Sequence, residues 1–435
     1  MWIVYEFLLL VSFLFYLPKA FWRKRLPHRG WSMRLGRYPQ AILTQLQHRP
    51  TIWIHAVSVG EVMAAQPLVA EFSAARPDHA VVVSTVTPAG FAAASRLLGQ
   101  AAVIIYGPLD FHFIVRRAFV ALQPQLVVLV ESELWPVLIH HASQRNIPVV
   151  VVNGRISARA FRRYQWVRPL LRSMLHAVQV FLMQTEQDAA RITAMGAPAE
   201  RVRVVGSLKW DASVSMRPSV EKCAELASRL GIQSGEVMLV AGSTHRGEED
   251  AVLDALHALR AQGLTARLIL APRHLERLAE VEALAARRGL AVQRASTIAA
   301  PLQRWDVALV DTIGTLPVYY GLATLVVIGG SLIPHGGQNP LEAASLGKPV
   351  VFGPFMHNFA DIAQRLLEHG AAAQVRDRTE LIELVRRLCE QPAQAQAMGQ
   401  RAKHTVEQCG GVARQTIQLL QSYYAPGSSA IQSPR

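Results

Sequence analysis

The stretch HAVVVSTVTPAGFAAASRLLGQAAVIIYG, residues 79–107, decides the fold class. A β-branched run opens it, a segment with apolar residues at helical spacing follows, and a second apolar run closes it. Short runs rich in valine and isoleucine are typical of strands that are buried on both faces. A strand, a helix and a strand in this order form a βαβ unit, so the stretch predicts a parallel sheet covered by helices.

The same alternation extends along the chain in both directions. The further strand candidates are TIWIHAV, QLVVLVE, PVVVVNG, QVFLMQT, RVRVVGS, EVMLVAGS, ARLILAPR, DVALVDT, TLVVIGGS and KPVVFGP. A less regular stretch, residues 208–222, interrupts the rhythm, and 435 residues exceed what one hydrophobic core organises. We therefore predict an α/β protein with two doubly wound, Rossmann-like domains that face an interdomain cleft, with ligands bound beyond the carboxyl ends of the strands.

These patterns divide the chain into five segments. They are an N-terminal segment (1–25), a first domain (26–207), a linker region (208–233), a second domain with closing helices (234–424) and a flexible tail (425–435).

The charge of the chain indicates an anionic partner. Forty-five Lys and Arg against 31 Asp and Glu give a net charge of +14. This excess attracts nucleic acid or lipid headgroups, but no zinc-finger spacing, aromatic RNA-binding signature or recognition-helix module is present, so we expect no nucleic-acid partner. Three scattered cysteines without a C-x-x-C pair favour a reducing compartment, and no cofactor or metal is expected.

The N-terminal segment MWIVYEFLLLVSFLFYLP is apolar over about the length of one membrane span, and the basic run KAFWRKR follows it. Charge after the apolar run, without a small-residue cleavage site, favours a retained anchor over a signal peptide. The positive-inside rule then predicts that the rest of the chain is cytoplasmic. Glu6 leaves open whether the segment spans the bilayer or lies at its interface.

Three acidic residues follow predicted strands in the first half. Glu61, in SVGE, has two readings: a helix-start carboxylate that interacts with the macrodipole, or a general base that the same dipole keeps ionised. Gly60 is expected to permit a tight turn before it. Glu131 and Glu133, in ESELWP, lie on one side of the chain if it stays extended, where structural or acceptor-contacting roles are expected more than metal binding.

Basic residues gather after the strand PVVVV. NGRISAR begins an arginine cluster within a run without acids from Leu134 to Thr185. Solvated helix faces are the usual explanation for such arginines, but the length of the run favours contacts with phosphates or headgroups.

In the second half, candidate ligand-binding residues also follow strands. GSTHRGEE and APRH bring Ser243, Pro272 and Arg273 to one rim, and Gly242 is expected to allow a close approach of the backbone. The loop GGSLIPHGGQNPLEAASLGKP suggests either a helix cap, with Asn339 at the N-cap and Glu342 near N3, or a phosphate held by loop amides with Glu342 on ribose hydroxyls. Its many glycines favour the second interpretation.

Taken together, HAVSVGEV, ESELWP, NGRISAR, GSTHRGEE, APRH, DTIG and the glycine-rich loop resemble the Kdo transferases, which move 3-deoxy-D-manno-octulosonic acid (Kdo) from CMP-Kdo onto a lipid A precursor. The resemblance extends from the N-terminus to about Asn358. It implies an inverting glycosyltransferase of GT-B architecture for lipopolysaccharide biosynthesis, held at the bacterial inner membrane and its anionic lipids, with an acceptor-binding first domain and a CMP-Kdo-binding second domain.

The resemblance also implies roles for individual residues. The family's catalytic base falls on Glu61. The donor-binding residues fall on Ser243, Pro272, Arg273, Thr312, Ile313, Gly314, Gly336, Gly337, Asn339 and Glu342. Candidate transition-state or acceptor contacts fall on Ser58, Gly60, Glu131, Arg155 and Lys209. The chain departs from the family pattern at Thr315, because the family commonly reads D-T-x-G-E-L, with a glutamate at this position.

Three other functions compete with this interpretation. A nucleotide-sugar epimerase shares the architecture but needs no anchor. A non-catalytic membrane-binding protein does not explain the glycine-rich loop and Arg273. A lipid glycosyltransferase that uses a UDP-sugar is the nearest rival. The sequence fixes neither the number of Kdo units transferred nor the oligomeric state.

Overall fold

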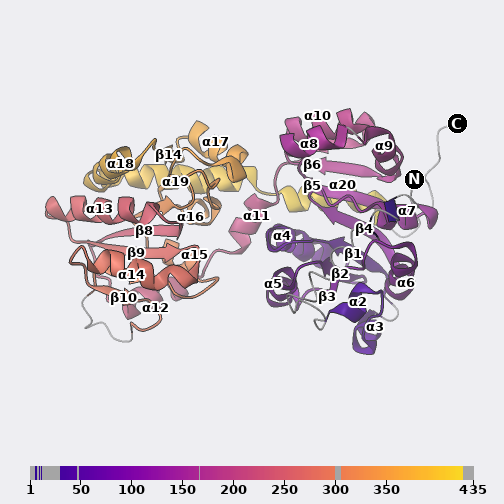
Figure 1. Cartoon of the computed structure of the whole chain (residues 1–435), viewed down its shortest axis with the longest axis horizontal. Coiled ribbons are helices and arrows are strands. Elements are labelled where there is room, and N and C mark those ends of the chain that lie inside the picture. Colours follow the sequence, from indigo (N-terminus) through magenta and orange to yellow (C-terminus); the bar gives the residue numbers. More distant parts are fainter. Residues whose placement is uncertain are drawn as a thin grey trace. The chain divides into compact units, whose positions relative to one another are not determined.

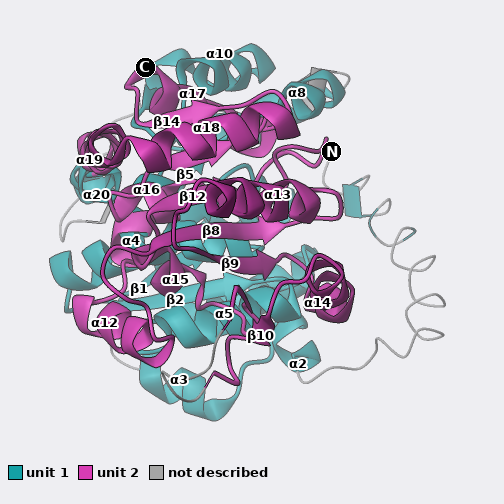
Figure 2. Ribbon diagram, turned by 90° about the vertical axis from the view of Figure 1, so that its left-hand side faces the viewer, with its two compact units in different colours: residues 1–212, 411–435 teal, residues 213–410 magenta. Residues whose placement is uncertain are grey.

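The computed structural model describes residues 5, 6, 9, 11, 30–46, 49–165, 167–298 and 305–424. They form two compact units, one of residues 1–212 and 411–435 and the other of residues 213–410 (Figure 1, Figure 2). Each unit is built on its own parallel sheet of seven strands. The predicted α/β class with two Rossmann-like domains is therefore confirmed.

The sheet of unit 1 has the strand order β3-β2-β1-β4-β5-β6-β7. Its strands are β1 (Thr51–His55), β2 (Ala80–Thr85), β3 (Val103–Tyr106), β4 (Pro124–Val130), β5 (Val149–Gly154), β6 (Val180–Met183) and β7 (Val202–Val204). β1 pairs with β2 on one side and with β4 on the other, so the strand order reverses between β1 and β4. The loops that follow these two strands lie at the switch point, where doubly wound sheets bind ligands.

Helices cover both faces of this sheet. They are α2 (Trp31–Arg34), α3 (Gln40–Leu46), α4 (Val59–Ala75), α5 (Pro88–Leu98), α6 (His112–Leu122), α7 (Pro136–Gln144), α8 (Ala158–Gln165), α9 (Arg168–Ala177), α10 (Glu186–Met195) and the 3-10 turn η1 (Ala199–Arg201). Alternate strand residues enter two separate cores, with Trp53 in the core under α6, α7, α9 and α10 and Ile54 in the core under α4 and α5. Burial on both faces explains why the strands show unbroken apolar runs.

The sheet of unit 2 has the order β10-β11-β9-β8-β12-β13-β14, with its switch point between β8 and β12. Its strands are β8 (Val237–Thr244), β9 (Ala266–Pro272), β10 (Val292–Arg294), β11 (Val307–Leu309), β12 (Leu325–Ile328), β13 (Val350–Phe352) and β14 (Ala372–Gln374). Its helices are α12 (Val220–Arg229), α13 (Glu248–Ala261), η2 (Leu275–Arg277), α14 (Leu278–Ala286), α15 (Leu316–Gly321), α16 (Leu341–Ser345), η3 (His357–Phe359), α17 (Ala360–Glu368), α18 (Arg378–Glu390) and α19 (Pro392–Cys409).

The last described helix, α20 (Val412–Tyr424), belongs to unit 1 and not to the second domain, where we had placed it. We expected residues 234–424 to form one domain, but α20 packs on α4 in unit 1, where Val412, Ile417 and Leu420 enter the core. The carboxylate of Asp211 accepts hydrogen bonds from the backbone N–H groups of Gly411 and Ala413 and so fixes the return of the chain. The sequence shows the helix but not the sheet that it covers.

The linker region differs as well. Residues 208–233 were expected to be a linker, with a less regular stretch at 208–222, but they contain α11 (Lys209–Ser215) and α12, and the boundary between the units falls after Ala212. The predicted anchor, residues 1–25, lies outside the described residues except for residues 5, 6, 9 and 11, and the tail 425–435 lies outside them entirely. Within the described ranges, no helix has both the length and the apolar character needed to cross a membrane.

Candidate active site

Glu61 lies in the first turn of α4, directly after β1 and therefore at the switch point of unit 1. Ser58 is the N-cap of this helix. Its hydroxyl donates to Oε1 of Glu61 at 2.8 Å, and the backbone N–H of Val57 donates to Oε2 at 2.7 Å. The Glu61 N–H in turn donates to the Ser58 hydroxyl oxygen at 3.4 Å. The carboxylate is thus held in one orientation, with each oxygen already engaged by a donor.

Burial decides the charge of Glu61. The residue is only 7% exposed, and this burial raises its pKa to about 7, with smaller contributions from the charges of Glu133 and Glu131. The two hydrogen bonds that lower the pKa do not offset the burial. We expected the helix dipole to keep Glu61 ionised, but burial has the larger effect and favours the neutral form. A pKa near 7 populates both forms at neutral pH, which suits a residue that accepts a proton and later releases it.

Gly60 does not form the tight turn that we predicted. It is an exposed residue within α4, and a Cβ added to it meets nothing closer than the Ser58 hydroxyl at 3.9 Å. The backbone therefore does not require glycine at this position. The glycine instead leaves the space beside Ser58 open.

Glu131 and Glu133 follow β4, on the other side of the switch point. Glu131 has a φ of 61°, so the chain leaves the extended conformation at once and the condition for placing the two residues on one side of the chain is not met. The Glu133 carboxylate accepts from the Trp135 indole N–H at 2.9 Å, and burial raises its pKa. Both carboxylates act on the pKa of Glu61, so three acidic groups gather beyond β1 and β4. Within the described ranges, no group of three His, Cys, Asp or Glu side chains is arranged to hold a metal ion.

Lys209 and Arg155 come from the ends of other strands. The Lys209 ammonium lies 4.0 Å from Oε1 of Glu131, at the limit of an ion pair. Asn153, at the end of β5, positions this lysine, because its Oδ1 accepts from the Leu208 N–H at 2.9 Å. The Arg155 carbonyl accepts from the Ser132 hydroxyl, which ties the loop after β5 to the loop after β4. The structure thus brings Ser58, Glu61, Glu131 and Lys209 to one edge of the sheet, with Arg155 on the adjoining loop.

In unit 2, Ser243 is the second-last residue of β8, and Arg273 directly follows the neighbouring strand β9. Ser243 has a φ of 57°, a conformation that is uncommon for serine and is often found at binding sites. Pro272 is the buried last residue of β9, and the exposed Arg273 follows it with its N–H bonded to the Thr244 carbonyl at 2.9 Å. The close approach expected at Gly242 is made by the protein itself, because a Cβ there would lie 1.9 Å from the Tyr320 hydroxyl.

Three histidines beside Arg273 were missed by the sequence analysis. The rings of His245 and His335 have centroids 3.9 Å apart, and those of His245 and His274 lie 5.6 Å apart. Burial, together with the charges of its neighbours, lowers the pKa of His245 to about 4, so its ring is neutral at pH 7. The available signal was that GSTHRGEE, APRH and the glycine-rich loop each contain one histidine.

Gly336 and Gly337 have the conformations that only glycine adopts readily. Their φ angles are 105° and 76°, and a Cβ would lie 2.3 Å from the Asn358 amide nitrogen or from the Met356 sulfur. We expected the amides of this loop to hold a phosphate, but those at its start are already occupied by the protein. The N–H groups of Gly330, Ser331 and Leu332 all donate to the carboxylate of Glu248.

The structure shows the capping interpretation of Asn339 and Glu342, whereas the contact of Glu342 with ribose hydroxyls stays a prediction. Helix α16 has Pro340 at its N-cap, one residue later than predicted, and Oδ1 of Asn339 accepts from the Leu341 N–H at 3.1 Å. The Asn339 amide donates to Glu342 at 3.4 Å. Burial raises the pKa of Glu342 to about 7. The pair therefore caps a helix and also keeps a titratable carboxylate close to the switch point of unit 2.

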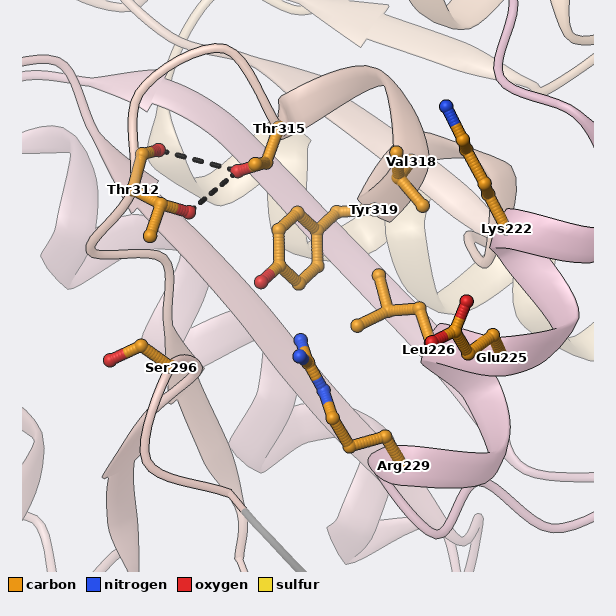
Figure 3. Close-up of a pocket in the computed structure, with 9 residues that line it drawn as sticks. All are labelled: Lys222, Glu225, Leu226, Arg229, Ser296, Thr312, Thr315, Val318 and Tyr319. Atoms are coloured by element: carbon orange, nitrogen blue, oxygen red, sulfur yellow. Dashed lines mark hydrogen bonds between the residues drawn. The ribbon is translucent and has the colours of Figure 1, made fainter.

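Thr312 and Thr315, from the loop of residues 311–315, border a pocket of about 350 Å³ (Figure 3). Thr312 and Thr315 bond to each other through their hydroxyls at 2.8 Å, Gly314 has a φ of 84°, and Ile313 is 79% exposed. Across the pocket, the Arg229 guanidinium points toward the Tyr319 ring. The remaining lining residues are Lys222, Glu225, Leu226, Ser296 and Val318. Thr315 ties the loop to itself through its contacts with the hydroxyl and the carbonyl of Thr312.

Comparison with known proteins gives a consistent family. Residues 29–212 match the family model described as 3-deoxy-D-manno-octulosonic-acid transferase (kdotransferase). The chain is 34% identical to the 3-deoxy-D-manno-octulosonic acid transferase of Bordetella pertussis over 86% of this chain and 87% of that protein. It is 32% identical to the protein of the same name from Haemophilus influenzae, with the same coverage of the two chains.

The fold has relatives outside this family. The UDP-GlcNAc 2-epimerase of Neisseria meningitidis, crystallised with UDP-GlcNAc, aligns with a TM-score of 0.60 at 14% identity, over 85% of this chain and 99% of that one. At this identity the likeness concerns the fold alone. The sequence relatives, in contrast, match over most of their length, and the chain therefore belongs to the Kdo transferase family of glycosyltransferases.

Proposed function

We propose that the protein transfers Kdo from CMP-Kdo to a phosphorylated lipid A precursor, lipid IVA, in lipopolysaccharide core biosynthesis, with inversion at the anomeric carbon. Family membership supports the transfer of Kdo. The observation that carries the choice of catalytic residue is the Glu61 carboxylate, which is buried, oriented by two donors and has a pKa of about 7. A single displacement by the acceptor explains inversion.

In this mechanism, ionised Glu61 accepts the proton of the acceptor hydroxyl while that oxygen bonds to the anomeric carbon of Kdo. The bond from this carbon to the CMP phosphate oxygen breaks at the same time, and CMP leaves with the bonding electrons. The Val57 N–H and the Ser58 hydroxyl keep the carboxylate in place during the step. The proton then passes from Glu61 to solvent, which its pKa near 7 permits.

Unit 2 binds the donor in this proposal. The exposed Arg273 and the neighbouring histidine rings offer positive charge and ring N–H groups to the CMP phosphate, whose negative charge grows as the bond breaks. Glu342 accepts hydrogen bonds from the ribose hydroxyls. The loop at Thr312 to Gly314, with the pocket beside it, holds the nucleoside.

Unit 1 binds the acceptor at the membrane. The exposed side chains of Arg159, Arg162 and Arg163 on α8 carry positive charge that suits lipid phosphates and the anionic lipids of the inner membrane. Residues 1–25 serve as the anchor and the two units are cytoplasmic. Membrane fractionation of the full chain and of a chain without residues 1–25, at low and high salt, tests the anchor separately from the basic surface.

Mass spectrometry tests the reaction directly. Lipid IVA is incubated with CMP-Kdo and the wild-type protein, Glu61→Gln, or the control Glu71→Gln on the same helix. We expect mass increments of one or more Kdo units with the wild type and the control and none with Glu61→Gln. Unchanged lipid with a folded wild type would overturn the assignment. Full activity of Glu61→Gln would keep the reaction and return Glu61 to a capping role.

Protection against heat identifies the nucleotide, because a ligand that binds the folded state raises the melting temperature. We expect CMP to stabilise the wild type and UDP not to. Preferential protection by UDP would favour the UDP-sugar transferase. A free sugar nucleotide isomer formed without lipid would favour an epimerase.

A further inference from the structure

Glu248 is a buried acid that the mechanism above does not use. It is the first residue of α13 and only 2% exposed. Its Oε1 accepts from the N–H groups of Ser331 and Leu332, both at 2.9 Å. Its Oε2 accepts from the N–H groups of Gly330 at 2.6 Å and His245 at 2.9 Å. Four backbone donors thus converge on one carboxylate.

The three loop amides belong to consecutive residues, and Gly330 has a φ of 66°. Successive amides in such a turn form a concave nest for an anion, the arrangement that binds phosphate in many nucleotide sites. Here the protein fills the nest with its own anion. A phosphate at the same place would have to displace a buried carboxylate or lie beside it, and like charges at that distance repel each other strongly.

Neighbouring contacts make the nest part of a larger framework. The Ser331 hydroxyl donates to the Ile328 carbonyl at 2.5 Å and accepts from the Gly353 N–H at 2.8 Å, which joins the loop to the end of β13. Glu249, the next residue, accepts from the Thr244 hydroxyl at 3.2 Å and from Arg277 at 2.8 Å. The two glutamates therefore connect the chain beyond β8 to the chain beyond β9 and β12, and Ser331 extends the connection to β13.

We propose that Glu248 is a positioning residue for donor binding: its carboxylate is the internal anion on which the glycine-rich loop folds. The same carboxylate holds the backbone of His245, so it fixes the loop and the histidine cluster relative to each other. The phosphate of the donor is then bound by side chains, Arg273 and the three histidines, and not by the amide nest. This proposal rests on the proposed function, in which unit 2 binds CMP-Kdo.

Replacing the side chain with an external anion tests the proposal. Glu248→Ala removes the atoms of an acetate ion, so added acetate can occupy the nest and restore the loop. We expect Glu248→Ala to raise the KM for CMP-Kdo by about tenfold or more, since hydrogen bonds to a charged acceptor are strong. Acetate should recover most of this loss and raise the melting temperature, while chloride at equal ionic strength should do neither.

Two further variants separate positioning from loss of stability. Leu253→Ala on the same helix opens a cavity in the core without touching the nest, and we expect it to lower the melting temperature without any response to acetate. Glu248→Gln keeps the volume but turns an amide group toward backbone donors. It should raise the KM for CMP-Kdo and give no response to acetate, because the site is filled.

The outcomes distinguish this proposal from the proposed function. A wild type that binds neither CMP nor CMP-Kdo would overturn both. A wild type that binds CMP, together with Glu248→Gln and folded Glu248→Ala variants of unchanged KM, would overturn the role of Glu248 alone. Equal responses of Glu248→Ala and Leu253→Ala to acetate would also overturn it, because they would reduce the effect to general stabilisation.

Discussion

Ser58 and Glu61 are bonded to each other twice: the Ser58 hydroxyl donates to the Glu61 carboxylate at 2.8 Å, and the Glu61 N–H donates to the same hydroxyl oxygen at 3.4 Å. One contact caps α4 and the other lowers the pKa of Glu61. The serine therefore affects the stability of the helix and the charge of the carboxylate at the same time, and the two effects can be measured apart.

Ser58→Ala should raise the pKa of Glu61 above its value of about 7, because the substitution removes a hydrogen bond to the ionised form. Less of the base is then ionised at pH 7, so the acidic limb of the profile of kcat/KM against pH should move to higher pH, with activity recovering in alkali. The lost cap should cost about 1 kcal/mol of unfolding free energy. Thr87→Ala, which removes the N-cap of α5, is the control: a similar cost without a shift of the pH profile is expected.

Gly60→Ala should leave the unliganded protein as stable as the wild type or stabilise it by about 0.5–1 kcal/mol, because alanine favours the helix and meets open space. If the acceptor occupies the space beside Ser58, the new methyl group should raise the KM for lipid IVA and leave the KM for CMP-Kdo unchanged. Steady-state kinetics with each substrate varied in turn provide the measurement. Unchanged acceptor kinetics would exclude this space from the acceptor site.

Glu61→Gln should change how stability depends on pH. Burial raises the folded-state pKa of Glu61 from 4.5 to about 7, so its contribution to stability is fully present below pH 4.5 and is lost as the pH rises through 7. Glutamine does not titrate. Denaturant unfolding at pH 5 and pH 8 should therefore show a smaller loss of stability at the higher pH for Glu61→Gln than for the wild type. Parallel curves would contradict the raised pKa.

Gly337→Ala should destabilise unit 2 and weaken protection by CMP. The substitution puts alanine at a φ of 76°, and its Cβ would lie 2.3 Å from the Met356 sulfur. Gly263→Ala is the matched control, since Gly263 has a φ of 80° with nothing within 4 Å of the added Cβ. Backbone strain alone should cost on the order of 1 kcal/mol in the control. A larger loss of melting temperature in Gly337→Ala, with loss of the CMP effect, is the expected result.

The strands that could be predicted from the sequence have runs rich in valine, isoleucine or leucine. Twelve such runs correspond to strands β1–β9 and β11–β13. The two strands that were missed, β10 and β14, have three residues each and lie at the two edges of the second sheet. Their side chains are less buried, so their apolar runs are short. The partner of α20 was not predictable either, because amphipathic spacing indicates a helix without identifying the sheet that it covers.

For the candidate site, the sequence identified residues that follow strands but not their electrostatic state. The pKa of Glu61 depends on burial and on Glu131 and Glu133, which are about 70 positions away and approach it only through the pairing of β1 with β4. Glu248, in GSTHRGEE, was not singled out from the sequence. Its role on the glycine-rich loop depends on the neighbouring positions of β8 and β12 in the folded sheet.

Because α20 completes the core of unit 1, the order of synthesis differs from the order of the units along the chain. Residues 1–212 leave the ribosome before unit 2, but the helix that covers one face of their sheet is made only after all of residues 213–410. Val412, Ile417 and Leu420 reach the apolar surface of α4 only after unit 2 has been synthesised. Part of the core of unit 1 therefore stays uncovered while unit 2 is synthesised. Premature termination after unit 2 would leave that surface available to chaperones and proteases.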